Sequence, residues 1–268
     1  MTASATLLEI RGAAKSFGGV QALDGVDLHL GTGEVLGVIG PNGSGKTTLF
    51  NLLTGVVRAS GGTARLAGAN LLDLKPWEIS ALGVARTFQN IRLALGQSVL
   101  QNVLVGAYRQ NRTSWWQVLL APHTVAVRET QAVEKAMEAL RFVAPALAAA
   151  PDRIVGELPY ADRRRIELAR AVVGNPRILL IDEPAAGMNP HETAEIADDI
   201  LRIAARGMSI LVIEHKMKFI ATVAPRIAVL NFGRKIAEGS YEQIRTDPHV
   251  LASYLGRKGD HLAASGDR

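Results

Sequence analysis

Short apolar runs alternate with helical patterns along much of the chain. The runs at residues 35–39, 178–181 and 210–213 are far too short to cross a bilayer and are typical of buried strands. Residues 47–53 have helical character after the first run, and residues 190–205 form a helical stretch between the second and the third. Strands that alternate with helices predict a mostly parallel sheet with helices on both faces.

The two ends of this pattern predict antiparallel pairing instead. Residues 7–30 alternate β-forming residues around a turn at residues 17–19, which favours an antiparallel β element at the N-terminus. Residues 227–230 and 235–237 flank a turn at residues 231–233 and predict a hairpin. The expected fold class is therefore α/β, with a parallel core and an added antiparallel element.

The periodicity becomes helical between residues 90 and 157. Val133, Met137, Leu140 and Val143 recur three or four positions apart, as on one face of a helix. We interpret residues 90–160 as a helical subdomain inserted into the α/β core.

Within this subdomain, residues 109–122 carry the adjacent pair Trp115 and Trp116 and are expected to form a surface excursion. Two tryptophans usually pack into a core, and binding of a partner is the alternative interpretation.

These patterns divide the chain into a single domain, residues 1–268, with two parts. The catalytic core is expected to comprise residues 1–89 and 161–256. Residues 90–160 form the helical subdomain, and the polar residues 257–268 are expected to be a flexible tail.

The composition excludes several classes of protein. At 48% hydrophobic and 21% charged residues, the chain is typical of a folded protein, and without cysteine it has no disulfide, thiolate metal site or cysteine nucleophile. Its start lacks a basic segment and is interrupted by Glu9, so we expect no secretory signal and a cytosolic location. The formal charge of +5 is spread out, and the basic residues 163–165 fit a solvated helix face better than a nucleic-acid or membrane patch.

A glycine-rich loop follows the first apolar run. Residues 40–47 fit the pattern G-x-x-x-x-G-K-[ST] between a predicted strand and a predicted helix, which indicates a phosphate-binding loop rather than a chance glycine-rich turn. Lys46 is expected to reach the β- and γ-phosphates of a nucleotide, and the Thr47 hydroxyl to bind Mg²⁺. The residues expected to bind the nucleotide here are Gly40, Pro41, Asn42, Gly43, Ser44, Gly45, Lys46, Thr47 and Thr48.

Two carboxylates follow the second apolar run. Asp182, nearer the metal, is expected to bind Mg²⁺ through water, and Glu183 to orient and deprotonate the attacking water. Capping of a helix N-terminus is the alternative role of such a pair.

The adjacent acids favour ABC-type ATPases over GTPases and small-molecule kinases, and residues 7–256 resemble the ATP-binding subunits of ABC transporters. This resemblance implies that Gln89, in residues 86–90, touches Mg²⁺ or the attacking water through a loop that also contacts the membrane subunit. It implies that His215 contacts the γ-phosphate, and that Phe17 stacks on adenine, for which a core phenylalanine is the alternative. The cofactors implied are ATP and Mg²⁺.

Residues 86–90, 182–187 and 238–256 look like those of branched-chain amino acid importer ATPases, with urea or amide importers and lipopolysaccharide exporters as alternatives. The resemblance implies a peripheral protein at the cytoplasmic face of the membrane, with two transmembrane permease subunits, a second ABC ATPase and a solute-binding protein as partners. No specific nucleic acid is expected. A soluble ABC ATPase acting on nucleic acid or ribosomes is disfavoured, because the chain has one cassette and no long heptad array. An ordinary P-loop kinase is a further alternative, in which the match of Glu183 and His215 to the ABC pattern would be a coincidence.

The chain departs from the family at the signature Leu-Ser-Gly-Gly-Gln, which in relatives binds the γ-phosphate held by the opposite subunit. The corresponding residues are Leu158, Pro159, Tyr160, Ala161 and Asp162. Pro159 lacks a hydroxyl and an N–H, Ala161 adds a methyl group and Asp162 adds negative charge near an anion. Each lost donor would contribute about 1.5–3 kcal/mol to a charged group. Because the signature acts on the partner's nucleotide, we expect a heterodimer with one strong and one degenerate site, and a homodimer is the alternative.

Overall fold

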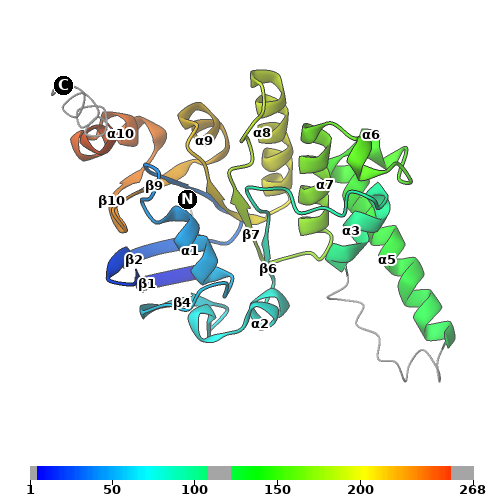
Figure 1. Cartoon of the computed structure of the whole chain (residues 1–268), viewed down its shortest axis with the longest axis horizontal. Coiled ribbons are helices and arrows are strands. Elements are labelled where there is room, and N and C mark those ends of the chain that lie inside the picture. The colour runs from blue at the N-terminus through cyan, green and yellow to red at the C-terminus, as the bar shows by residue number, and fades with distance from the viewer. Residues whose placement is uncertain (1–4, 108–121, 255–268) are drawn as a thin grey trace.

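The computed structural model describes residues 5–107 and 122–254 (Figure 1). The predictions for Trp115, Trp116 and the tail at residues 257–268 lie outside these residues, as does the surface excursion except for its last residue, Pro122. The elements, in chain order, are β1 (Thr6–Phe17), β2 (Val20–Gly31), β3 (Val35–Ile39), α1 (Lys46–Leu53), β4 (Gly61–Leu66), β5 (Ala69–Asn70), η1 (Leu71–Asp73), α2 (Pro76–Ala81), β6 (Val84–Arg86), α3 (Val99–Ala107), α5 (Pro122–Val143), α6 (Pro145–Ala148), η3 (Val155–Glu157), α7 (Tyr160–Val172), β7 (Ile178–Asp182), α8 (Pro190–Ala205), β8 (Ser209–Ile213), α9 (Met217–Val223), β9 (Arg226–Asn231), β10 (Arg234–Gly239) and α10 (Tyr241–Thr246).

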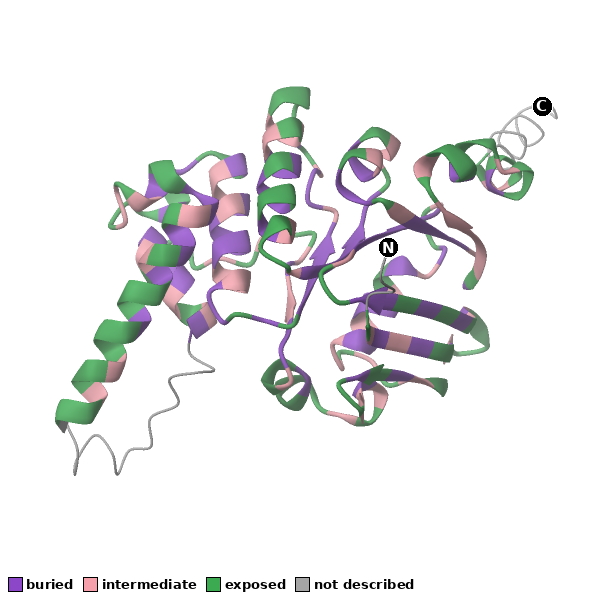
Figure 2. Cartoon of the chain, turned by 180° about the vertical axis from the view of Figure 1, so that it is seen from behind, coloured by how far each residue is buried: buried purple, intermediate pink, exposed green. Residues whose placement is uncertain are grey.

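A six-stranded sheet in the order β10-β9-β3-β8-β7-β6 forms the centre of the molecule. All neighbouring pairs are parallel except the β9–β10 hairpin. Successive residues of its inner strands point into different cores, as the two-residue period of a strand requires: in β7, Leu179 and Ile181 face one core, whereas Ile178 and Leu180 face the other. Figure 2 shows buried residues concentrated on these central strands, with exposed residues on the outer faces of the flanking helices.

A four-stranded antiparallel sheet in the order β2-β1-β4-β5 lies on one side of the core. Helix α1 packs between the two sheets through Leu49, Phe50, Leu52 and Leu53, which are all buried in the core that the sheets share. The predicted N-terminal antiparallel element, parallel sheet and C-terminal hairpin are confirmed, and α8 has the bounds predicted for it.

The helices α3, α5, α6 and α7 gather at the opposite side of the central sheet (Figure 1). Helix α7 packs mainly against α3 and α5, although the expected division assigns residues 161–256 to the catalytic core. It is therefore shared between the two parts, and the division at residue 160 stays a prediction.

The predicted apolar face of α5 is wrong at one position. Leu140 and Val143 are buried, but Val133 is 38% exposed. Ala132 and Ala136 occupy the buried face in its place, because small residues let α5 approach its neighbours closely. Among the helices of the described part of the chain, none has the length and apolar character needed to span a membrane.

Candidate functional site

The glycine-rich loop connects β3 to α1, and its shape depends on two of its glycines. Gly40 has φ +150° and Gly45 has φ +107°, in the region that side chains disfavour. A Cβ atom on Gly40 would lie 2.1 Å from the carbonyl oxygen of Leu230, and one on Gly45 would lie 2.6 Å from that of Ala22. The loop can therefore curl against β2 and β9 only with glycine at these two positions.

The interior of this loop has the chemistry of an anion site. The Lys46 ammonium donates hydrogen bonds to the carbonyl oxygens of Gly40 at 2.8 Å and Pro41 at 3.0 Å, which places its charge inside the curl. The Ser44 hydroxyl is buried without a hydrogen-bond partner among the described residues. Helix α1 begins without a side-chain cap. An oxyanion in the loop would satisfy the hydroxyl and the first amides of α1.

Two carboxylates emerge where β7 ends beside β8. Asp182 is buried, and its Oδ2 accepts a hydrogen bond from the Arg86 guanidinium at 2.8 Å. Glu183 follows with φ +45°, and its N–H donates to the Ile213 carbonyl at 2.9 Å. The next helix, α8, is capped by Asn189, so the alternative role of the two acids as helix caps is wrong.

The Glu183 carboxylate lies among groups of both charges. Its Oε2 accepts a hydrogen bond from the Gln89 amide nitrogen at 2.9 Å and is 3.9 Å from Nδ1 of His215. Burial raises the pKa of Glu183, His215 and Lys46 oppose this increase, and the nearby acids Glu214 and Asp182 add to it. The result is a carboxylate of increased basicity near the phosphate loop.

Three further predicted residues have donor groups suited to Mg²⁺. Thr47 supplies a hydroxyl at the start of α1, Asp182 a carboxylate and Gln89 an amide oxygen that its bond to Glu183 does not use. Such uncharged and carboxylate oxygens suit Mg²⁺, which usually takes one or two carboxylates together with substrate phosphates. In residues 5–107 and 122–254 no three His, Cys, Asp or Glu residues are grouped so that they could hold a metal ion.

Comparisons with known proteins agree with this geometry. The profile of the family described as ABC transporter matches residues 23–186, and that of the branched-chain amino acid ATP-binding cassette transporter matches residues 234–260. The LivG protein of Escherichia coli K12, a high-affinity branched-chain amino acid transport ATP-binding protein, is 40% identical over 94% of this chain and 99% of its own length. The corresponding BraF protein of Pseudomonas aeruginosa is 39% identical with the same coverage.

A solved structure agrees as well. The ADP conformation of MJ1267, an ATP-binding cassette of an ABC transporter, superposes with a TM-score of 0.81 and 31% identity, over 94% of this chain and 100% of that one. The chain belongs to the ABC transporter family. It is an ATP-binding cassette of that family, which hydrolyses ATP in a transporter.

The signature segment of the cassette lies at the start of α7. Pro159 is the N-cap and supplies no side-chain bond to the helix. Asp162 is paired with Arg165 at 3.4 Å, which offsets its negative charge. The methyl group of Ala161 is packed in the core, whereas Tyr160 is 41% exposed at the surface. The effect of these residues on a nucleotide held by the partner stays a prediction. Leu158 is buried beneath them.

Phe17 of the cassette is 47% exposed at the turn between β1 and β2, with the Lys15 ammonium 4.6 Å from the centre of its ring. The alternative of a core phenylalanine is therefore wrong, and a ring face is accessible at this turn. Stacking on adenine stays a prediction.

Two charged residues that complete the site were not predicted from the sequence. Arg86 bonds to Asp182 and also donates to the side chains of Asn51 at 2.7 Å and Thr54 at 3.2 Å. Glu214 is fully buried and accepts bonds from the N–H groups of His215 at 2.8 Å and Lys216 at 3.2 Å. In the sequence, each of these two charged residues lies at the end of an apolar strand, which could have marked it as a site residue. Their bonding partners are far away in the sequence or in the main chain, so they become visible only in the folded structure.

Proposed function

We propose that this cassette powers the uptake of branched-chain amino acids, as a peripheral subunit at the cytoplasmic face of the cell membrane. The observation that carries the proposal is the match of residues 234–260 to the branched-chain amino acid cassettes, in a chain whose remaining length carries the ATPase site. The names of the relatives in Escherichia coli and Pseudomonas aeruginosa point to the same solute.

In this proposal the phosphate loop binds the nucleotide first. The inward-facing amides of the loop and the Lys46 ammonium hold the β- and γ-phosphates, and Phe17 stacks on adenine. The unpartnered hydroxyl of Ser44 supports this role, because a buried hydroxyl gains a partner when a phosphate oxygen enters the loop.

Thr47 and, through water, Asp182 would hold Mg²⁺, with Gln89 beside it. The metal would supply charge neutralisation at the β- and γ-phosphates. The buried contact with Arg86 at 2.8 Å holds the Asp182 carboxylate in place at the end of β7.

The attacking water is deprotonated by Glu183, whose raised pKa makes it a stronger base than an ordinary glutamate. Gln89 fixes the carboxylate by donating to Oε2. His215 is close enough to stabilise charge that develops beside Glu183, and Glu214 orients its peptide group.

The permease subunits would dock in a groove of about 680 Å³ between α2, β6, α3 and α7. Its lining includes the exposed apolar side chains of Trp77, 58% exposed, and Val105, 63% exposed, and the neighbours Arg86 and Phe88 of Gln89. Exposed apolar residues around a groove are typical of a protein interface. A movement of a permease in this groove would reach the catalytic residues through the four residues from Arg86 to Gln89. A solute-binding protein completes the importer in this proposal.

The second nucleotide-binding subunit is a different chain in this proposal, because the signature of this one is degenerate. Its Pro159 offers no hydroxyl to a nucleotide held by the partner. Changing Pro159→Ser together with Ala161→Gly should raise ATP turnover of the assembled transporter, measured as phosphate release. The single change Ala161→Gly is the control, because that methyl group is packed in the core. Unchanged turnover of the double variant would contradict a defective signature.

Transport itself is tested with the complete assembly in vesicles. The cassette, its two permease subunits and its second ATPase are reconstituted with ATP inside and the solute-binding protein outside, and uptake of radiolabelled leucine is compared with that of urea. We expect ATP-dependent leucine uptake that Lys46→Ala abolishes. Uptake of urea but not of leucine, or uptake that survives Lys46→Ala, would refute the proposal.

A further inference from the structure

The main chain around Gln89 is held by an ion pair on α7. The Arg164 guanidinium donates to the carbonyl oxygen of Phe88 at 2.7 Å and to that of Gln89 at 2.9 Å. Glu167, one turn along the helix, accepts the N–H of Phe88 at 3.2 Å. Three of the main-chain polar groups of two consecutive residues, Phe88 and Gln89, are therefore bound by two side chains of one helix.

This ion pair lies in the interior of the protein. Arg164 is fully buried, Glu167 is 1% exposed, and their side chains meet at 2.7 Å. Burial raises the pKa of Glu167, and Arg164 opposes this effect. A buried ion pair contributes little net stability compared with packed apolar side chains, so its presence here is better explained by the positions that it fixes. The planar guanidinium fixes direction as well as distance for both carbonyl groups.

The same arginine also reaches the signature segment. Its second terminal nitrogen donates to the hydroxyl of Tyr160 at 3.1 Å, and its guanidinium carbon is 5.8 Å from the centre of that ring. At the other end of the contact, the Gln89 side chain donates to Glu183. A continuous set of polar contacts thus runs from Tyr160 through Arg164 and Gln89 to the Glu183 carboxylate.

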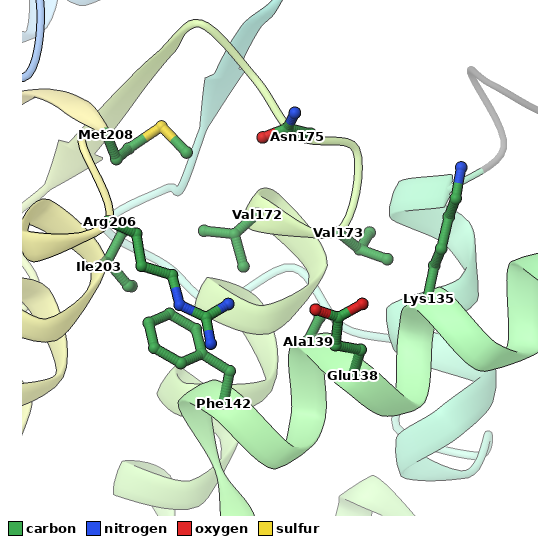
Figure 3. Close-up of a pocket in the computed structure, with 10 residues that line it drawn as sticks. All are labelled: Lys135, Glu138, Ala139, Phe142, Val172, Val173, Asn175, Ile203, Arg206 and Met208. Atoms are coloured by element: carbon green, nitrogen blue, oxygen red, sulfur yellow. The ribbon is translucent and has the colours of Figure 1, made fainter.

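The end of α7 borders a cavity on one side. A cavity of about 440 Å³ separates α5 and the end of α7 from the end of α8, with Val172 and Val173 on its wall (Figure 3). Figure 3 shows the Arg206 guanidinium over the Phe142 ring, 3.4 Å from its centre, as a bridge across one side of the cavity. Arg164 holds the first half of α7 to the Gln89 loop, so a movement of this part of the helix would displace the loop.

We propose that Arg164 is a positioning residue for ATP hydrolysis, which sets Gln89 against Glu183 and ties this geometry to Tyr160 in the signature. The inference rests on the roles proposed above for Gln89 and Glu183. Contact of the partner's nucleotide with Tyr160 then changes the position of the base in this chain's own site.

The contact itself is tested in the purified full chain by hydrogen exchange. In Arg164→Lys the charge beside Glu167 is kept, but the fork that binds two carbonyl groups is lost. We expect exchange of the Phe88 amide, which donates to Glu167, to accelerate about tenfold or more, because the two carbonyl groups lose the guanidinium that holds this segment against Glu167. Arg165→Lys is the matched control, because this neighbouring arginine pairs with Glu195 and Asp199 of α8 instead. Equal exchange of the Phe88 amide in both variants would overturn the proposal.

The role in hydrolysis is tested by steady-state phosphate release from Mg-ATP in the assembled transporter. We expect Arg164→Lys to lower kcat about tenfold to a hundredfold with KM nearly unchanged, because a misplaced group slows the chemical step rather than binding. In a Gln89→Ala background the same change should cause no further loss. If the fold-losses in kcat of the two single variants multiply in the double variant, Arg164 does not act through Gln89, and the proposal is overturned.

The two hypotheses fail in different ways. If Gln89→Ala alone turns over ATP like the unmodified chain, the role proposed for Gln89 is wrong, and the positioning role of Arg164 is wrong with it. If Gln89→Ala is slow and Arg164→Lys is not, only the positioning role is wrong.

Discussion

At the scale of single residues, Glu183 combines an unusual backbone with an unusual charge environment. Its φ of +45° is rare for a residue with a side chain and costs of the order of 1–3 kcal/mol, which the surrounding strands must offset. Burial and two nearby acids raise its pKa. Strain and a raised pKa at the same carboxylate are typical of a group selected for chemistry rather than for stability.

This raised pKa predicts the pH dependence of turnover. A general base acts when deprotonated, so activity is present above the pKa of Glu183 and is lost as pH falls through it. The loss should begin at a higher pH than for a glutamate with the ordinary value of 4.5. Removing the negative charge nearby with Glu214→Gln should lower the pKa and move the acid limb of kcat to lower pH. The profile is measured as phosphate release across the pH range. An acid limb at the same pH in Glu214→Gln and in the unmodified chain would contradict the assignment of this limb to Glu183.

Arg86 allows a prediction about stability. The pair with Asp182 is almost completely buried, with side-chain exposures of 6% and 4%. Arg86→Gln leaves a buried carboxylate without its partner and should lower the free energy of unfolding by about 3–5 kcal/mol, measured by urea denaturation. Adding Asp182→Asn removes the stranded charge and should recover much of this loss without recovering ATPase activity. A single variant as stable as the unmodified chain would show that Asp182 does not depend on Arg86.

At the scale of elements, the sequence predicted most of what builds the site. The apolar runs of β3, β7 and β8 each end at a polar motif, and parallel strands bring these ends to one edge, so Lys46, Glu183 and His215 could be expected together. The antiparallel sheet and the final hairpin followed from alternation and turn residues.

What the sequence did not predict depends on packing between distant segments. The bonds of Arg86 to Asp182 and of Arg164 to the Phe88 peptide join residues 96 and 76 positions apart. Charged residues are normally interpreted as surface residues, so the burial of Arg164 had no signal in periodicity. On α5, the alanines of the buried face are only weakly hydrophobic, so the sequence pattern assigned the more hydrophobic Val133 to that face, although it is exposed.

The packing of the phosphate loop against β9 gives a prediction at this scale. In Gly40→Ala the new methyl group would meet the Leu230 carbonyl, whereas a methyl group on Gly68, also at positive φ, would meet nothing within 4 Å. Both variants carry backbone strain, so the difference between them isolates the clash. We expect the free energy of unfolding of Gly40→Ala, measured by urea denaturation, to be about 1–3 kcal/mol lower than that of Gly68→Ala. We also expect Gly40→Ala to bind ATP more weakly. Equal stability of the two would mean that the loop is not packed as described.

At the scale of the whole molecule, the cassette joins a rigid sheet core to a helical layer. The groups proposed for catalysis lie at strand ends of the core, while the groove proposed for the permeases borders α3 and α7, and the signature segment lies at the start of α7. The loop of Gln89 connects the two parts and is bound from both, by its own side chain to Glu183 and by Arg164 of α7. Binding of partners to the helical layer is therefore expected to change hydrolysis in the core.

In the proposed mechanism Glu183 primes water against a nucleotide held by the loop around Lys46. The most direct test is the comparison of Mg-ATP binding with phosphate release in the assembled transporter that carries Glu183→Gln in this chain. We expect ATP affinity close to that of the unmodified complex and a loss of about 10²–10⁴-fold in turnover at this site, because the shape is kept and the base is removed. Turnover at the unmodified rate, or loss of ATP binding, would contradict it.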